Sequence, residues 1–177
     1  QRRAVVFVSA HYGNWEIASL TAGQHGMAVH HVYRQANNPI LERMIQRFRR
    51  ATLGSYHPKG RAGTRELARA ARRGEHLALL ADQKMNEGIA VPFFGRPAMT
   101  APALAAIALR FGLPVVPVRV DRLPAGRFRV SVFPPLAPPE TGDARAAVLL
   151  GAINATFEDW IRARPDHWLW LHRRWPD

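Results

Sequence analysis

A histidine and a glutamate five positions apart, His11 and Glu16, are the residues of this sequence best suited to chemistry. An imidazole that donates one N–H to a carboxylate keeps its other nitrogen available to accept a proton from a hydroxyl. If the intervening loop folds back, Glu16 orients His11 in this way and the substrate's own alcohol becomes the nucleophile. The pair therefore predicts His11 as general base and Glu16 as its partner, with no enzyme nucleophile.

The spacing of this pair is not specific by itself. His172 and Asp177 are also five positions apart, at the end of the chain and interrupted by Pro176. Histidine–carboxylate pairs also occur in purely structural roles. A structural pair therefore stays open until the surrounding elements are considered.

Polar residues follow three short apolar segments that are typical of buried parallel strands. His11 follows the first segment, Arg34 the second and Asp82 the third. In α/β domains ligands bind outside the carboxyl ends of the strands, so these three side chains are expected to converge on one crevice. The three segments are residues 4–10, 27–33 and 76–81.

Helical segments alternate with these strands. Asn14 and Thr100 are possible helix caps, and Asn38 with Pro39 is a cap and first-turn proline. The basic segment 54–63 and the Pro- and aromatic-rich segment 89–99 are expected to be loops. Helices are predicted at 15–22, 39–50, 64–73, 101–111 and 143–162, with later strands at 114–121 and 128–133. The order predicts an α/β fold, a single domain over residues 1–177.

Composition narrows the function further. The 177 residues contain no cysteine, which excludes disulfides, thiolate metal sites and cysteine nucleophiles. The formal net charge is +12, mostly from arginine, which favours anionic partners such as phosphates, anionic lipid or nucleic acid. No apolar run approaches the roughly 20 residues of a membrane-spanning helix. The start at Gln1 without a signal peptide suggests a fragment that lacks an N-terminal membrane-associated segment.

Several blocks of the sequence, taken in order, resemble the bacterial lipid A biosynthesis acyltransferases, also called lauroyl or late acyltransferases. His11 to Glu16 matches the His-x4-Glu/Asp motif of that family. The other blocks that carry the resemblance are Val32 to Pro39 around Arg34, Leu80 to Gly88 around Asp82, Val91 to Thr100, and the aromatic-basic ending Trp168 to Trp175.

The resemblance implies a mixed, largely parallel central sheet flanked by helices, as in glycerolphosphate acyltransferases. It implies O-acyl transfer from an acyl carrier protein or coenzyme A thioester to a hydroxyl of a Kdo-bearing lipid A precursor, in lipopolysaccharide biosynthesis. No metal or other cofactor is expected. The implied location is the cytoplasmic face of the bacterial inner membrane, with acyl carrier protein, the lipid A precursor and the anionic membrane surface as partners.

The resemblance also assigns roles to individual residues. It makes His11 and Glu16 catalytic, and Arg34 a group for substrate phosphate or the developing oxyanion. Asp82, Gln83 and Lys84 are expected to bind the acceptor. Three apolar residues, Phe93, Phe94 and Met99, are candidates for an acyl channel, although such residues are commonly ordinary core.

Other interpretations remain at this stage. Ten basic residues between Arg43 and Arg73 can face lipid phosphates, an acidic carrier protein or only solvent. The tryptophans at the end of the chain can lie at an interface or close the core. Another phospholipid or glycolipid acceptor is possible, and the alternative from a different class is a nucleic-acid-binding domain, for which no binding motif is present. A serine hydrolase is the alternative enzyme, but this sequence lacks the Gly-x-Ser-x-Gly turn of such enzymes.

Overall fold

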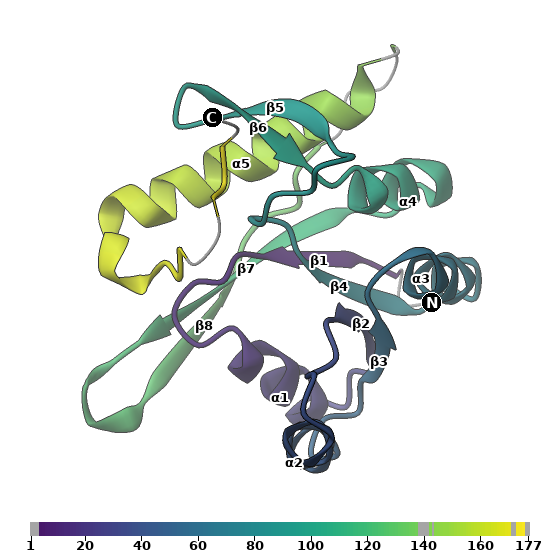
Figure 1. The fold of residues 1–177 in the computed structure, drawn as a ribbon, viewed down its shortest axis with the longest axis vertical. Helices are drawn as coiled ribbons and strands as arrows, with labels where there is room; N and C mark the ends of the chain where they lie inside the picture. The colour runs from purple at the N-terminus through teal and green to yellow at the C-terminus, as the bar shows by residue number, and fades with distance from the viewer. Residues whose placement is uncertain (1–3, 138–141, 143, 171–172, 176–177) are drawn as a thin grey trace.

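The computed structural model describes residues 4–137, 142, 144–170 and 173–175 (Figure 1). Strands and helices alternate through the first half of the chain, as expected. The strands are β1 (Val6–Ser9), β2 (Val29–Tyr33), β3 (Ser55–Pro58), β4 (His76–Leu80), β5 (Ile89–Phe93), β6 (Arg96–Thr100), β7 (Val115–Arg122) and β8 (Phe128–Val132). The helices are α1 (Glu16–Gln24), α2 (Pro39–Arg49), α3 (Arg61–Arg72), α4 (Ala103–Phe111) and α5 (Arg145–Ala163).

The central sheet has six strands in the order β3-β2-β4-β1-β7-β8. The first five strands in this order are parallel to one another, and β8 pairs antiparallel with β7. This is the mixed, largely parallel sheet flanked by helices that the sequence predicts. Since β1 lies between β4 and β7, the residues after β1 and β4 emerge side by side at one edge.

One face of the sheet carries the apolar core. The side chains of Val6 and Val8 on β1 are almost fully buried there, against α3, α4 and α5. Leu67 on α3, Leu104 on α4 and Leu150 on α5 belong to the same cluster. Burial of large aliphatic side chains stabilises the fold by about 1.5–3 kcal/mol each, so this face holds the domain together.

The other face is covered more thinly. Helix α1 contacts β7 and β8, and α2 lies beside α1 at the outer end of the molecule (Figure 1). Neither α1 nor α2 contains a buried residue. Among the described residues no helix is long and apolar enough to cross a membrane.

Two segments expected to be loops contain strands. Residues 89–99 fall in the antiparallel hairpin β5–β6, in which Pro92 pairs with Pro97. Both strands of this two-stranded sheet are edge strands, where proline is tolerated. The basic segment 54–63 includes β3, which pairs with β2 at the edge of the sheet. The two regular stretches escaped prediction because Pro and Gly are usually turn signals.

Helix starts were predicted with mixed success. Asn38 caps α2, with its side-chain oxygen accepting from the amides of Ile40 and Leu41, and Pro39 is the first residue of the helix. Asn14 and Thr100 are not caps: α1 begins after Trp15, and Thr100 ends β6 and is buried. Capping by Asn38 was recognisable because the proline follows it directly.

The C-terminal tryptophans partly close the core. The Trp175 indole stacks on Phe93 and donates to the Phe93 carbonyl oxygen at 2.9 Å. The Arg174 guanidinium is buried and donates to Thr100 and to the carbonyl oxygen of Met99. Trp170, in contrast, is largely exposed. The His172–Asp177 pair lies outside the described residues.

Candidate active site

His11 and Asp82 meet where their strands end. The parallel pairing of β1 with β4 sets Ser9 opposite Leu80, so the residues that follow both strands emerge together. The Nδ1 atom of His11 lies 2.8 Å from Oδ1 of Asp82. The His11 backbone amide also donates to Oδ2 of the same carboxylate, at 2.9 Å. One aspartate therefore fixes both the ring and the backbone of the histidine.

The Asp82 carboxylate is held in its charged form. It is buried, and its Oδ2 accepts a third hydrogen bond from the indole N–H of Trp168 at 3.0 Å. Burial alone would raise the pKa of Asp82, but the hydrogen bonds and charge of His11, together with Trp168, hold that pKa below its ordinary value. A charged carboxylate only accepts, so Nδ1 of His11 donates to it, and the neutral form of this imidazole has its lone pair at Nε2.

The amide of Gln83 marks the position in front of that lone pair. Its Nε2 atom lies 3.2 Å from Nε2 of His11, the distance of an N–H donor to an imidazole acceptor. The His11 side chain retains 16% of its surface exposed, so the ring is still accessible. A hydroxyl that takes the place of the amide would donate its proton to His11, which is the geometry of a general base.

The expected contact between Glu16 and His11 is not formed, and this corrects the role predicted for Glu16. Oε1 of Glu16 pairs with Nη2 of Arg49 at 2.8 Å, and Asp82 occupies the His11 nitrogen that Glu16 was expected to orient. The Trp15 ring stands edge-on to the imidazole, with ring centroids 4.8 Å apart. Helix α1 then begins at Glu16 and directs its carboxylate toward α2.

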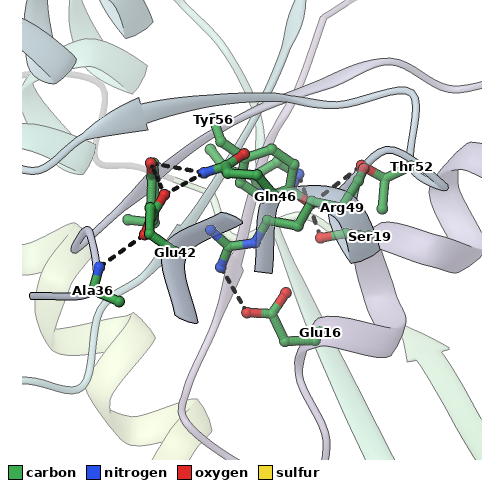
Figure 2. Close-up of polar contacts among 10 residues, drawn as sticks. Glu16, Ser19, Ala36, Glu42, Gln46, Arg49, Thr52 and Tyr56 are labelled. Carbon is green, nitrogen blue, oxygen red and sulfur yellow. Dashed lines mark hydrogen bonds and ion pairs between the residues drawn. The ribbon is translucent and has the colours of Figure 1, made fainter. Parts of the chain in front are cut away.

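Arg49 links Glu16 to a polar network between α2 and the sheet (Figure 2). Its guanidinium lies over the rings of Tyr33 and Tyr56, 4.7 and 4.4 Å from their centroids. Nε and Nη1 of Arg49 are buried without a hydrogen-bond partner among the described residues, so the aromatic faces take the place of acceptors. The arginine is thus a built part of the site rather than a surface charge.

Sequence reasoning counted Arg49 only among the basic residues of its helix. A signal was available: Glu42, Gln46 and Arg49 are spaced by four and three residues and so share one face of α2. Glu42 accepts from the Tyr33 hydroxyl, the Gln46 amide and the backbone amide of Ala36. A stripe of hydrogen-bonding side chains opposite the apolar side of a helix is the signal of such an internal network.

The predicted substrate-binding residues fall in two places. Gln83 contacts His11, and Lys84 lies next to it in a pocket of about 420 Å³. Arg34 directly follows β2 and is exposed. The pocket is lined by Lys59, Lys84, Met85, Asn86, Glu87 and Arg173. The pocket is basic, and its lining residue Lys84 directly follows Gln83, which contacts the His11 ring.

The three residues predicted for an acyl channel belong to the β5–β6 hairpin. Phe93 is fully buried and stacks with Trp175, while the backbone amide of Phe94 donates to Glu158 on α5 at 2.8 Å. Met99 is partly buried on β6. Their role in holding an acyl chain stays a prediction. Among the described residues no group of His, Asp or Glu is arranged to hold a metal ion.

A glycine lets the His11 loop lie close to β7. Gly13 has φ +58°, and a Cβ atom there would stand 2.0 Å from the carbonyl oxygen of Val120. The Gly13 amide donates to the carbonyl oxygen of His167 at 2.7 Å, and the His11 carbonyl oxygen accepts from Leu169 at 2.8 Å. The loop is therefore fixed from β7 and from the C-terminal segment at once.

Comparison with known proteins places these features in a family. The sequence matches the bacterial lipid A biosynthesis acyltransferases over residues 1–177, and the chain belongs to that family. It is 25% identical over 178 residues to the lipid A biosynthesis lauroyltransferase of Escherichia coli (strain K12), covering 98% of this chain and 56% of that protein. The chain thus spans about half the length of this relative.

A solved structure shares the fold. The crystal structure of the 1-acyl-sn-glycerophosphate (LPA) acyltransferase PlsC from Thermotoga maritima superposes with a TM-score of 0.54 and 16% identity, over 93% of this chain and 68% of that one. The fold is therefore of the glycerolphosphate-acyltransferase type. The family and both of these proteins are acyltransferases.

Proposed function

We propose that this protein transfers a long-chain fatty acyl group from an acyl thioester to a hydroxyl of a Kdo-bearing lipid A precursor. The observation that carries the proposal is the His11 imidazole, which Asp82 holds at Nδ1 while Nε2 faces a position suited to a hydroxyl. Membership of the lipid A acyltransferase family supports the choice of lipid acceptor.

The reaction runs directly between donor and acceptor. Nε2 of His11 takes the proton of the acceptor hydroxyl while its oxygen attacks the thioester carbonyl. The tetrahedral intermediate collapses by breaking the carbon–sulfur bond, and the leaving thiolate takes the proton back from the imidazolium. Asp82 stabilises the imidazolium in between, and an ester and a free thiol are formed.

Glu16 and Arg49 act as positioning residues in this scheme. Their ion pair fastens the first residue of α1 to α2, and Trp15, one residue earlier, lies against the His11 ring. The Glu16 carboxylate therefore affects the imidazole through the packing of Trp15. The mechanism keeps the predicted importance of Glu16 but assigns the direct contact to Asp82.

The acceptor's anionic head is assigned to the basic residues around the site. Lys84 and Lys59 line the pocket next to Gln83, and Arg34 follows the neighbouring strand. Phosphate and carboxylate groups are attracted by such clusters, and the net charge of +12 adds a favourable field. The same field suits acyl carrier protein as donor and the cytoplasmic face of the inner membrane as location.

Acyl transfer from acyl carrier protein thioester to a Kdo-bearing lipid A precursor tests the proposal. We expect His11→Ala to lower the rate by about 10³-fold, because general-base catalysis contributes roughly 10²–10⁴. His25→Ala, which removes an exposed histidine elsewhere, is the matched control. Lysophosphatidic acid serves as competing acceptor. Transfer only to lysophosphatidic acid would refute the lipid A assignment, and an active His11→Ala variant would refute the mechanism.

A further inference from the structure

Helix α2 presents its apolar side to solvent. Ile40 is 61% exposed, Met44 64% and Phe48 59%, and no residue of the helix is buried. At 100° per residue these three side chains span one arc, which Leu41 extends. An amphipathic helix of a globular protein normally turns this arc to the core. In α2 this apolar arc faces solvent instead.

The polar side of the same helix faces the protein. Glu42 and Gln46 hydrogen bond with the Tyr33 hydroxyl. Arg49 lies over the Tyr33 and Tyr56 rings and pairs with Glu16, and Figure 2 shows this ion pair. These contacts fix the rotation of α2 about its axis. The outward direction of the apolar arc is therefore a built feature, since turning it inward would break every one of them.

Basic residues flank the apolar arc. Arg43, Arg47 and Arg50 are exposed and lie on the helix side next to Ile40. Leu53, just beyond the helix, adds a further side chain that is 57% exposed. An apolar strip beside a row of arginines matches a phospholipid surface, where acyl chains lie under anionic headgroups. Nucleic acid would use the arginines but leave the apolar strip in water.

We propose that α2 lies in the surface of an anionic bilayer, with Ile40, Met44 and Phe48 among the acyl chains. The proposal deepens the proposed function, because it names the face through which the enzyme meets its lipid acceptor. On the side of α2 that faces the protein, Arg49 pairs with Glu16 on α1. The helix proposed to contact the membrane is therefore joined directly to the segment that carries Trp15 and His11. In Figure 1, α2 forms the end of the molecule away from α5.

Sedimentation with vesicles tests the docking surface without any catalysis. The probes are vesicles of phosphatidylethanolamine and phosphatidylglycerol in equal parts, and vesicles of phosphatidylcholine alone. We expect the protein to bind the anionic vesicles, and the pair Met44→Gln and Phe48→Gln to weaken this binding at least about tenfold. The matched control is Val132→Gln with Val148→Gln, which removes two exposed apolar side chains from β8 and α5.

The charged flank is tested in the same assay. Arg43→Gln, Arg47→Gln and Arg50→Gln together should weaken binding to anionic vesicles more than the same change at Arg61, Arg65 and Arg72 on α3. If the two sets weakened binding equally, the net charge of the protein would explain the interaction and the assignment to α2 would be wrong.

Three other outcomes would also overturn it: wild-type protein that binds no vesicles, α2 variants that bind as wild type, or a lipid-free dimer that the α2 variants dissociate. The His11→Ala variant separates the two proposals, because it should bind vesicles normally. Vesicle binding without acyl transfer would refute the proposed function alone. Acyl transfer without vesicle binding would refute the docking surface alone.

Discussion

The two faces of the central sheet differ in what holds them together. The face under α3, α4 and α5 is an apolar core in which Val6, Leu150 and Phe157 are fully buried. The face under α1 and α2 carries a network of ion pairs, stacked rings and hydroxyls around Arg49 (Figure 2). The first face supplies stability, and the second leaves polar groups available for a site.

The difference explains where the candidate site lies. A dry core would penalise the uncompensated charges that a transfer reaction needs, whereas the polar face already contains paired charges and partly exposed rings. His11 and Asp82 stand at the strand ends between these environments, where Asp82 is buried but fully hydrogen-bonded. Four substitutions test this division, from the largest expected effect to the smallest.

The largest effect is expected at the point where the two environments meet. Asp82→Asn removes the charge that fixes the His11 tautomer and stabilises its protonated form, so acyl transfer should fall by about 10³-fold. Steady-state kinetics with circular dichroism to verify folding measures this. Trp168→Phe, which removes one donor to the same carboxylate but keeps its charge, should have a much smaller effect. A loss of less than threefold in Asp82→Asn would remove Asp82 from the mechanism.

The apolar face should affect stability but not chemistry. Leu150→Ala is expected to lower the free energy of unfolding by about 2–5 kcal/mol, because it leaves a cavity in the core. Met44→Ala, on the exposed arc of α2, should change it by less than about 0.5 kcal/mol. Urea denaturation compares the two. Activity per folded molecule should be unchanged in Leu150→Ala, and a specific loss of activity would blur the division between the faces.

Acid should weaken the polar face first. Burial, with Arg49, His30 and His57 nearby, lowers the pKa of His31 from 6.5 to about 4. Above pH 6.5 His31 is neutral in both the folded and the unfolded protein, so it does not oppose folding. As the pH falls from 6.5 to about 4, the unfolded protein binds a proton at His31 that the folded protein does not, and the free energy of unfolding decreases. One proton over this range corresponds to about 3 kcal/mol. Unfolding free energies measured against pH should show this decline, and His31→Phe should flatten it. An unchanged slope in His31→Phe would assign the acid sensitivity to other groups.

The smallest effect is expected at the ion pair between α1 and α2. Arg49→Lys keeps the charge but loses the planar group that lies over the Tyr33 and Tyr56 rings, so stability should fall by about 1–2 kcal/mol. Thermal unfolding measures the change, with Arg47→Lys on the exposed side of the helix as control. Equal stability of the two variants would mean that the network around Arg49 contributes little.

The strand ends were predictable because apolar segments followed by polar residues have a fixed meaning in a parallel sheet. His11 and Asp82 were both expected at one edge, and the structure brings them into contact. Their direct pairing was not foreseen, because the sequence places Glu16 closer to His11 along the chain. Local spacing could not reveal that Asp82 pairs with the imidazole or that Arg49 pairs with the Glu16 carboxylate.

The same reasoning explains why the sequence drew attention to Arg34 and not to Arg49. Arg34 stands out in the sequence because it follows a strand, whereas Arg49 is one of many basic residues on a helix. What distinguishes Arg49 is the rotation of α2, which depends on the tertiary contacts of Glu42 and Gln46. Sequence patterns predict which face of a helix is apolar, but not that this face points outward.

The hydrogen bond from the His11 backbone amide to Asp82 gives the site an intrinsic spectroscopic reporter. An amide proton that points at a buried carboxylate resonates according to the charge of that carboxylate, and it exchanges slowly with solvent while the bond persists. One nitrogen-15 correlation peak would thus follow the protonation of Asp82 and the arrival of a lipid or thioester at the imidazole. The state of the reacting centre can be read from a backbone atom, without a label on substrate or side chain.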